Sequence, residues 1–129
     1  MLDISTSTPV QVTPRGRPVF SCLRTDTGAE ARIAVAGELD LATAPQLEAA
    51  LRQAEACRPT VLDLRGLTFV DCSGARVMEA AHRRALQAGG RLVVVRGPAD
   101  VERLFVLAGV EPELEFVDRS PAAFSPVIE

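Results

Sequence analysis

The sequence lacks lysine, tryptophan and tyrosine, and it has one histidine, His82. All 14 basic residues are therefore arginine, so no lysine is available as a catalytic base or a phosphate-binding group. The net charge is −3 and no basic stripe appears, which argues against nucleic acid as a partner. The five phenylalanines are the only aromatic residues, so the core must be mainly aliphatic.

The sequence has few cysteines and no recognisable targeting signal. Cys22, Cys57 and Cys72 lack metal-binding spacing, and His82 does not complete a zinc site with them, so we expect no metal and no cofactor. The odd cysteine count indicates a reducing compartment and predicts a cytoplasmic protein. We see no signal peptide, and no apolar run approaches the roughly 20 residues that span a bilayer, so we expect no membrane partner.

The length and composition suit one domain. The chain has 129 residues, 47% of them hydrophobic, which is enough for a single core. Residues 1–18 are rich in Ser, Thr and Pro and are expected to form a flexible N-terminal arm. The domain should cover residues 19–118, followed by a C-terminal tail at 119–129.

Hydrophobic periodicity predicts alternating strands and helices. We expect strands at residues 19–23, 31–37, 61–64, 92–95 and 114–117. The first two should form an antiparallel hairpin, and the others should pair in parallel through right-handed crossovers. Residues 65–69 are expected to be a loop. The sequence thus predicts an α/β fold with a small mixed sheet.

Three helices should connect these strands. The first is capped by Asp40 or Thr43 and ends near residues 57–58, with Pro59 as a stop. The second begins at Ser73 and ends at Gly89, and the third runs from Pro98 to Gly109. Each helix is expected to have an apolar face. The first helix has Leu47, Ala50, Leu51 and Ala54 there, and the second has Val77, Met78, Ala81, Ala85 and Leu86. The third has Val101, Leu104, Phe105, Leu107 and Ala108.

The residue pattern argues against an enzyme. Ser73 lacks the G-x-S-x-G elbow of serine hydrolases, and His82 lies more than two turns further along the same helix. His82 is expected to face solvent. No glycine-rich phosphate loop occurs, so the chain itself should bind no nucleotide.

Two other groups of residues have alternative interpretations. Asp40, Asp63 and Asp71 lie at or near the ends of strands and could hold a magnesium ion, but short acids at helix starts are more typical of caps. Cys72 is either a reactive thiol at a helix N-terminus or, as we favour, a small half-buried filler.

Ser73 is the most informative residue. It is either a plain helix N-cap, which contributes about 1 kcal/mol, or an acceptor of phosphate. Asp71 already offers a capping oxygen, and small residues surround the serine. A phosphate would add close to two negative charges beside Asp71 and block a contact surface without refolding the domain.

The chain resembles the STAS domain, and more narrowly the bacterial anti-sigma factor antagonists. The resemblance covers about residues 19–118 and rests on the stretches GELDLATAP at 37–45, VLDL at 61–64 and FVDCSG at 69–74. It implies a mixed sheet of four to five strands with helices packed on it. It also implies that the chain binds an anti-sigma factor that is a serine kinase with its own ATP. Binding releases a sigma factor, phosphorylation of Ser73 breaks the complex, and a phosphatase resets it.

The resemblance also implies which residues contact the partner. They are Asp40, Leu41, Thr43, Asp71, Cys72, Gly74 and Arg76. Two positions depart from the family pattern: Cys72 replaces the usual Ser or Thr, and Ala75-Arg76 replaces the common Leu-Gly pair. We expect a monomer or a weak dimer formed through the edge strand near Val19. The alternative role is a STAS scaffold, or a subunit of a lipid-transport ABC system, without regulation by phosphorylation.

Overall fold

The computed structural model describes residues 19–54, 59–110 and 113–118. The elements are β1 (Ser21–Asp26), β2 (Ala31–Leu39), α1 (Ala44–Gln53), β3 (Pro59–Val70), α2 (Cys72–Gln87), β4 (Arg91–Val95), α3 (Ala99–Ala108) and β5 (Glu115–Val117). The five strands form one sheet in the order β1-β2-β3-β4-β5. β1 pairs with β2 antiparallel, and the other neighbours pair in parallel, which confirms the predicted mixed α/β fold.

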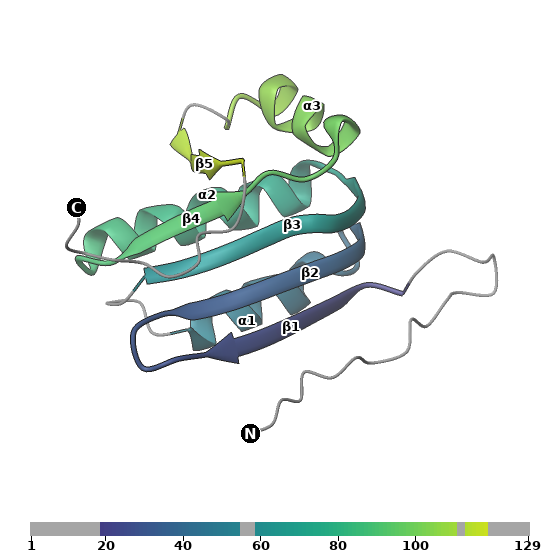
Figure 1. Cartoon of the computed structure of the whole chain (residues 1–129). Coiled ribbons are helices and arrows are strands. Elements are labelled where there is room, and N and C mark those ends of the chain that lie inside the picture. The colour runs from purple at the N-terminus through teal and green to yellow at the C-terminus, as the bar shows by residue number, and fades with distance from the viewer. Residues whose placement is uncertain (1–18, 55–58, 111–112, 119–129) are drawn as a thin grey trace.

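The helices divide between two positions around the sheet. Figure 1 shows α1 and α2 side by side on one face, whereas α3 stands next to β5 at the edge opposite β1. One helix connects each pair of neighbouring parallel strands here, α1 between β2 and β3 and α2 between β3 and β4. The carboxyl ends of β2 and β3 therefore lie together, and the loops that follow them are neighbours.

The core lies mainly between the sheet and the helices. Ile33, Val35 and Leu39 alternate with more exposed residues along β2, as a strand covered on one face requires. Leu47 and Met78 pack against them from α1 and α2. Phe105 of α3 joins the same cluster and lies 5.5 Å, centroid to centroid, from Phe116 of β5. The core is mainly aliphatic, as the composition predicted.

β3 differs most from its prediction, because residues 65–69 continue the strand instead of forming a loop. The pairing of β2 with β3 shifts register between Ala34 and Ala36 and again between Gly37 and Glu38. Such bulges break the strict alternation of polar and apolar residues that identifies a strand in sequence. Arg65-Gly66 consequently resembles a turn although it lies inside a ladder.

Helix boundaries and faces show smaller differences. α1 ends at Gln53, before the predicted end; residues 55–58 lie outside the described part of the chain, as do 1–18 and 119–129. Leu86 and Leu107 are 60% and 76% exposed, so their predicted inward placement is wrong. Leu107 is two residues from buried Phe105 and thus faces away from the core. Leu86 lies in the last turn of α2, one position past the apolar stripe.

Candidate functional site

The N-terminus of α2 is the centre of the candidate site. Asp71 is the N-cap: its carboxylate accepts the backbone N–H of Ser73 at 2.9 Å and that of Gly74 at 3.4 Å. The interpretation of Ser73 as the cap is therefore wrong, because Ser73 is the second residue of the helix. Ser73 is half-buried, and among the described residues no hydrogen bond involves its hydroxyl.

Gly74 holds this turn against the sheet. It is buried, and a Cβ at this position would lie 2.6 Å from both Cγ and Cδ2 of Leu39 and 2.9 Å from Cγ2 of Val70. The resemblance to the family implies that Gly74 is a contact residue. The structure places it beneath that surface, where the missing side chain allows α2 to approach β2 and β3 closely.

The loop after β2 is fixed by Asp40 and Thr43. The Asp40 carboxylate accepts the backbone N–H of Ala42 at 3.0 Å and of Thr43 at 3.1 Å. The Thr43 hydroxyl donates to the carbonyl of Glu38 at 2.9 Å and accepts the backbone N–H of Asp40 at 2.9 Å. Thr43 occupies the N-cap position of α1, but neither side chain caps the helix as predicted, since both are used inside the loop.

A backbone hydrogen bond joins this loop to the turn that carries Ser73. The N–H of Asp71 donates to the carbonyl of Leu39 at 3.1 Å. Asp40, Thr43, Asp71 and Ser73 therefore belong to one continuous edge of the sheet.

Apolar side chains stand exposed around this edge. Leu41 is 76% exposed and Phe69 is 47% exposed, and Cys72 is also exposed. The prediction that Cys72 is half-buried is wrong, because the first residue of α2 lies outside the core. Sequence reasoning missed Phe69, which it assigned to a loop; its place directly before Val70 and Asp71 was the available signal.

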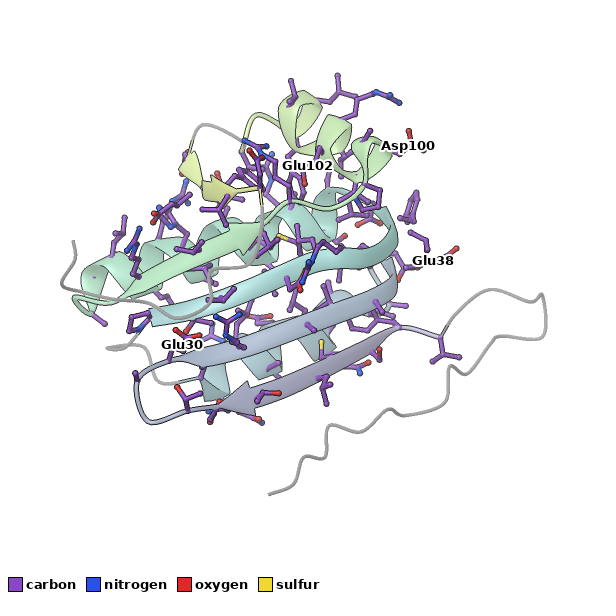
Figure 2. All side chains as sticks on the ribbon, viewed as in Figure 1. Glu30, Glu38, Asp100 and Glu102 are labelled. Carbon is purple, nitrogen blue, oxygen red and sulfur yellow. The ribbon has the colours of Figure 1, made fainter. Side chains whose placement is uncertain are left out.

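A groove of about 320 Å³ extends this surface towards α3. Thr68, Phe69 and Val70 form one side, and residues of α3 form the other: Asp100, Val101, Arg103, Leu104 and Leu107. Figure 2 shows Glu38 and Asp100 at this end of the sheet and Glu30 at the opposite end. An exposed apolar groove with charged residues of both signs along one side is suited to contact with another protein.

Arg76 connects α2 with α3. Its guanidinium donates to the Glu79 carboxylate at 3.1 Å and to the carbonyl of Ala108 at 3.4 Å. Glu79 also pairs with Arg83 at 3.3 Å, and Arg83 reaches Glu113 at 3.0 Å. Arg76 is exposed, as a contact residue must be, but the structure also gives it partners within the chain.

The three predicted acids do not converge. Asp63 lies within β3 because the strand continues beyond it, and it pairs with Arg65 at 2.6 Å. Partial burial raises the pKa of Asp63, but the hydrogen bonds and charge of Arg65 outweigh this and hold it below its ordinary value. Across residues 19–54, 59–110 and 113–118, no group of three or more His, Cys, Asp or Glu side chains could hold a metal ion.

His82 and Cys22 lie away from Ser73, nine residues further along α2 and on β1, respectively. Burial raises the pKa of the Cys22 thiol to about 11. His82 is half-buried and its buried Nδ1 has no hydrogen-bond partner among the described residues, so the prediction of a solvent-facing histidine is wrong. Cys57 lies outside the described residues. In the described part of the chain, no helix is long and apolar enough to cross a bilayer.

Comparison with known proteins identifies the family. A family model described as "Mlab, STAS domain" matches residues 22–117. The chain therefore belongs to the STAS domain family, which confirms the resemblance seen in the sequence.

Solved structures share this fold at low sequence identity. An anti-sigma factor antagonist from Mycobacterium paratuberculosis matches with a TM-score of 0.65 and 21% identity, over 84% of this chain and 92% of that one. SpoIIAA in its unphosphorylated form matches with a TM-score of 0.61 and 22% identity, over 78% of this chain and 90% of that one. The Bacillus cell fate determinant SpoIIAA in the phosphorylated form matches with a TM-score of 0.57 and 20% identity, over 78% of this chain and 93% of that one.

Proposed function

We propose that this protein is an anti-sigma factor antagonist controlled at Ser73. It binds an anti-sigma factor that is also a serine kinase, and this binding releases a sigma factor for transcription. The kinase uses its own ATP to phosphorylate Ser73, which separates the two proteins, and a phosphatase restores the antagonist. The antagonist itself has no enzymatic activity and acts in the cytoplasm as a monomer or a weak dimer.

The placement of Ser73 carries this proposal. Asp71 caps the helix, so the Ser73 hydroxyl is not required for capping and can be modified without loss of the cap. The serine lies at an edge where two loops are joined by the bond between Asp71 and Leu39. A phosphate there would place close to two negative charges beside Asp71, on the surface that the partner contacts.

The contact surface consists of residues on both sides of Ser73. We assign to it Asp40, Leu41, Thr43, Asp71, Cys72 and Arg76, and we add exposed Phe69. Gly74 positions the turn from below. The likeness to SpoIIAA, which is known in phosphorylated and unphosphorylated forms, supports a switch of this kind.

A phosphorylation assay tests the proposal. The purified protein is incubated with ATP and lysate of its own organism, and its phosphopeptides are measured by mass spectrometry. We expect one phosphate on Ser73. It should be lost in Ser73→Ala and retained in Ser21→Ala, a control that removes an exposed serine from β1.

A second candidate function is a STAS scaffold, or a subunit of a lipid-transport ABC system, without phosphorylation. The observation that favours it is the description of the matching family model, which names Mlab and not an antagonist. Absence of phosphate on Ser73, together with stable binding of transporter subunits to the wild-type protein, would support this candidate and overturn the first.

A further inference from the structure

Arg76 lies one helical turn after Ser73 and ties α2 to the end of α3. Its guanidinium donates to Glu79 at 3.1 Å and to the carbonyl oxygen of Ala108 at 3.4 Å. Ala108 is the last residue of α3, so its carbonyl has no partner within that helix. Arg76 therefore holds together two helices that border the Ser73 surface.

Glu79 does not depend on Arg76 alone. Its side chain is only 10% exposed, and it pairs with Arg83 at 3.3 Å as well as with Arg76. A buried carboxylate without a cation would be strongly destabilising, but Arg83 would still neutralise Glu79 if Arg76 turned away. Arg76 can therefore leave Glu79 for another anion with only a small loss of stability.

A phosphate on Ser73 would need such a cation. The Asp71 carboxylate already accepts the backbone N–H groups of Ser73 and Gly74, the second and third residues of α2, and its charge repels a second anion. Residues three positions apart are neighbours on a helix, so Arg76 is within reach of Ser73. The guanidinium fork also matches a phosphate group better than it matches one carboxylate oxygen.

We propose that Arg76 is the internal partner of a phosphate on Ser73. On phosphorylation, Arg76 leaves Glu79 and the Ala108 carbonyl and pairs with the phosphate. Modification of α2 is thereby transmitted to the C-terminal end of α3, next to the groove between α3 and β3. This inference rests on the proposed function in that Ser73 must be the residue that carries the phosphate.

The second ionisation of the phosphate tests the pairing. Phosphoserine is encoded at position 73 during translation, so that no kinase is needed, and the phosphate is titrated by phosphorus NMR. A neighbouring cation favours the dianion, so we expect the second pKa of the phosphate to be lower than in Arg76→Gln by about 0.5 pH unit or more.

Arg84→Gln is the matched control. It removes an arginine of the same helix that does not pair with Glu79 and lies about three turns from Ser73, so it should leave the second pKa at the wild-type value. Equal second pKa values in the wild-type protein and Arg76→Gln would overturn the proposal.

Hydrogen exchange tests the release of α3. The amides of residues 107–110 should exchange faster in the phosphorylated than in the unphosphorylated wild-type protein, and phosphorylation should have no such effect in Arg76→Gln. Unchanged exchange in the wild type would overturn the change of partners.

The outcomes separate this inference from the proposed function. If no kinase modifies Ser73 but the encoded phosphoserine has a lowered second pKa, the proposed function is wrong and the pairing of Arg76 with the phosphate is supported. If a kinase modifies Ser73 but Arg76→Gln leaves the second pKa of the phosphate unchanged, the proposed function is supported and the pairing of Arg76 with the phosphate is wrong.

Discussion

The carboxylate of Asp71 accepts the backbone N–H of Ser73 over 2.9 Å, so the residue that caps α2 is not the residue proposed for modification. This separation of roles matters because phosphorylation of a capping serine would change the acceptor offered to the N–H groups of the helix start. With Asp71 as the cap, the helix start is fixed in both states of Ser73. The switch can then act through charge at the surface.

Replacement of Asp71 tests this division of roles. Asp71→Ala removes the acceptor for two backbone N–H groups and should lower the free energy of unfolding by about 1 kcal/mol. Asp71→Asn keeps a capping oxygen and should stay close to the wild type. Urea denaturation at neutral pH measures both; equal losses in the two variants would contradict the capping role.

Charge at Ser73 should control partner binding. Ser73→Asp adds one negative charge to the proposed contact surface and should weaken binding of the anti-sigma factor about tenfold or more, whereas Ser73→Ala should stay bound. Ser21→Asp adds the same charge on β1 and serves as the control. Isothermal titration calorimetry measures the affinities. Equal affinities of Ser73→Asp and Ser73→Ala would contradict control of binding by charge at position 73.

Gly74 should be more sensitive than an exposed glycine. In Gly74→Ala the new Cβ meets Leu39 at 2.6 Å, and this overpacking should cost about 1–3 kcal/mol. Gly28→Ala is the control, because no described residue beyond its two chain neighbours lies within 4 Å of the new Cβ, and its effect should stay within about 0.5 kcal/mol. Thermal or urea unfolding of both variants checks the difference. Equal stability of the two would mean that α2 does not need the close approach.

The loop after β2 should depend on the hydroxyl of Thr43. Thr43→Val removes the donor to the Glu38 carbonyl and the acceptor of the Asp40 N–H, so it should lower stability by about 1 kcal/mol. The Asp40 amide should also exchange faster with solvent. Thr43→Ser keeps the hydroxyl and should preserve both properties. A Thr43→Val protein with unaltered exchange at Asp40 would show that the hydroxyl does not fix the loop.

The two described cysteines should react at very different rates. Burial raises the pKa of Cys22 to about 11, so only about one thiol in a thousand is ionised at pH 8, and the thiolate is the reacting form. Exposed Cys72 should therefore be alkylated first. Mass spectrometry of a Cys57→Ser protein treated with iodoacetamide measures the order. Faster labelling of Cys22 would contradict its burial.

The sequence predicted the topology but not every strand limit. The turn at 26–28 and the apolar run at 92–95 identify the β1–β2 hairpin and β4, because local chemistry and hydrophobic pattern agree there. The second half of β3 was missed because two register shifts against β2 disturb the alternation of residues. Pairing with a neighbouring strand, which no local pattern records, keeps those residues in the sheet.

Sequence alone determined the aliphatic core, the mixed sheet and the serine before a glycine at a helix start, since composition, periodicity and motif spacing are local properties. Tertiary structure decided that Gly74 is buried under Leu39 and that Arg76 reaches the end of α3. These two features depend on how closely α2 approaches the sheet and α3. That distance is set by packing between segments far apart in the chain, and no stretch of sequence specifies it by itself.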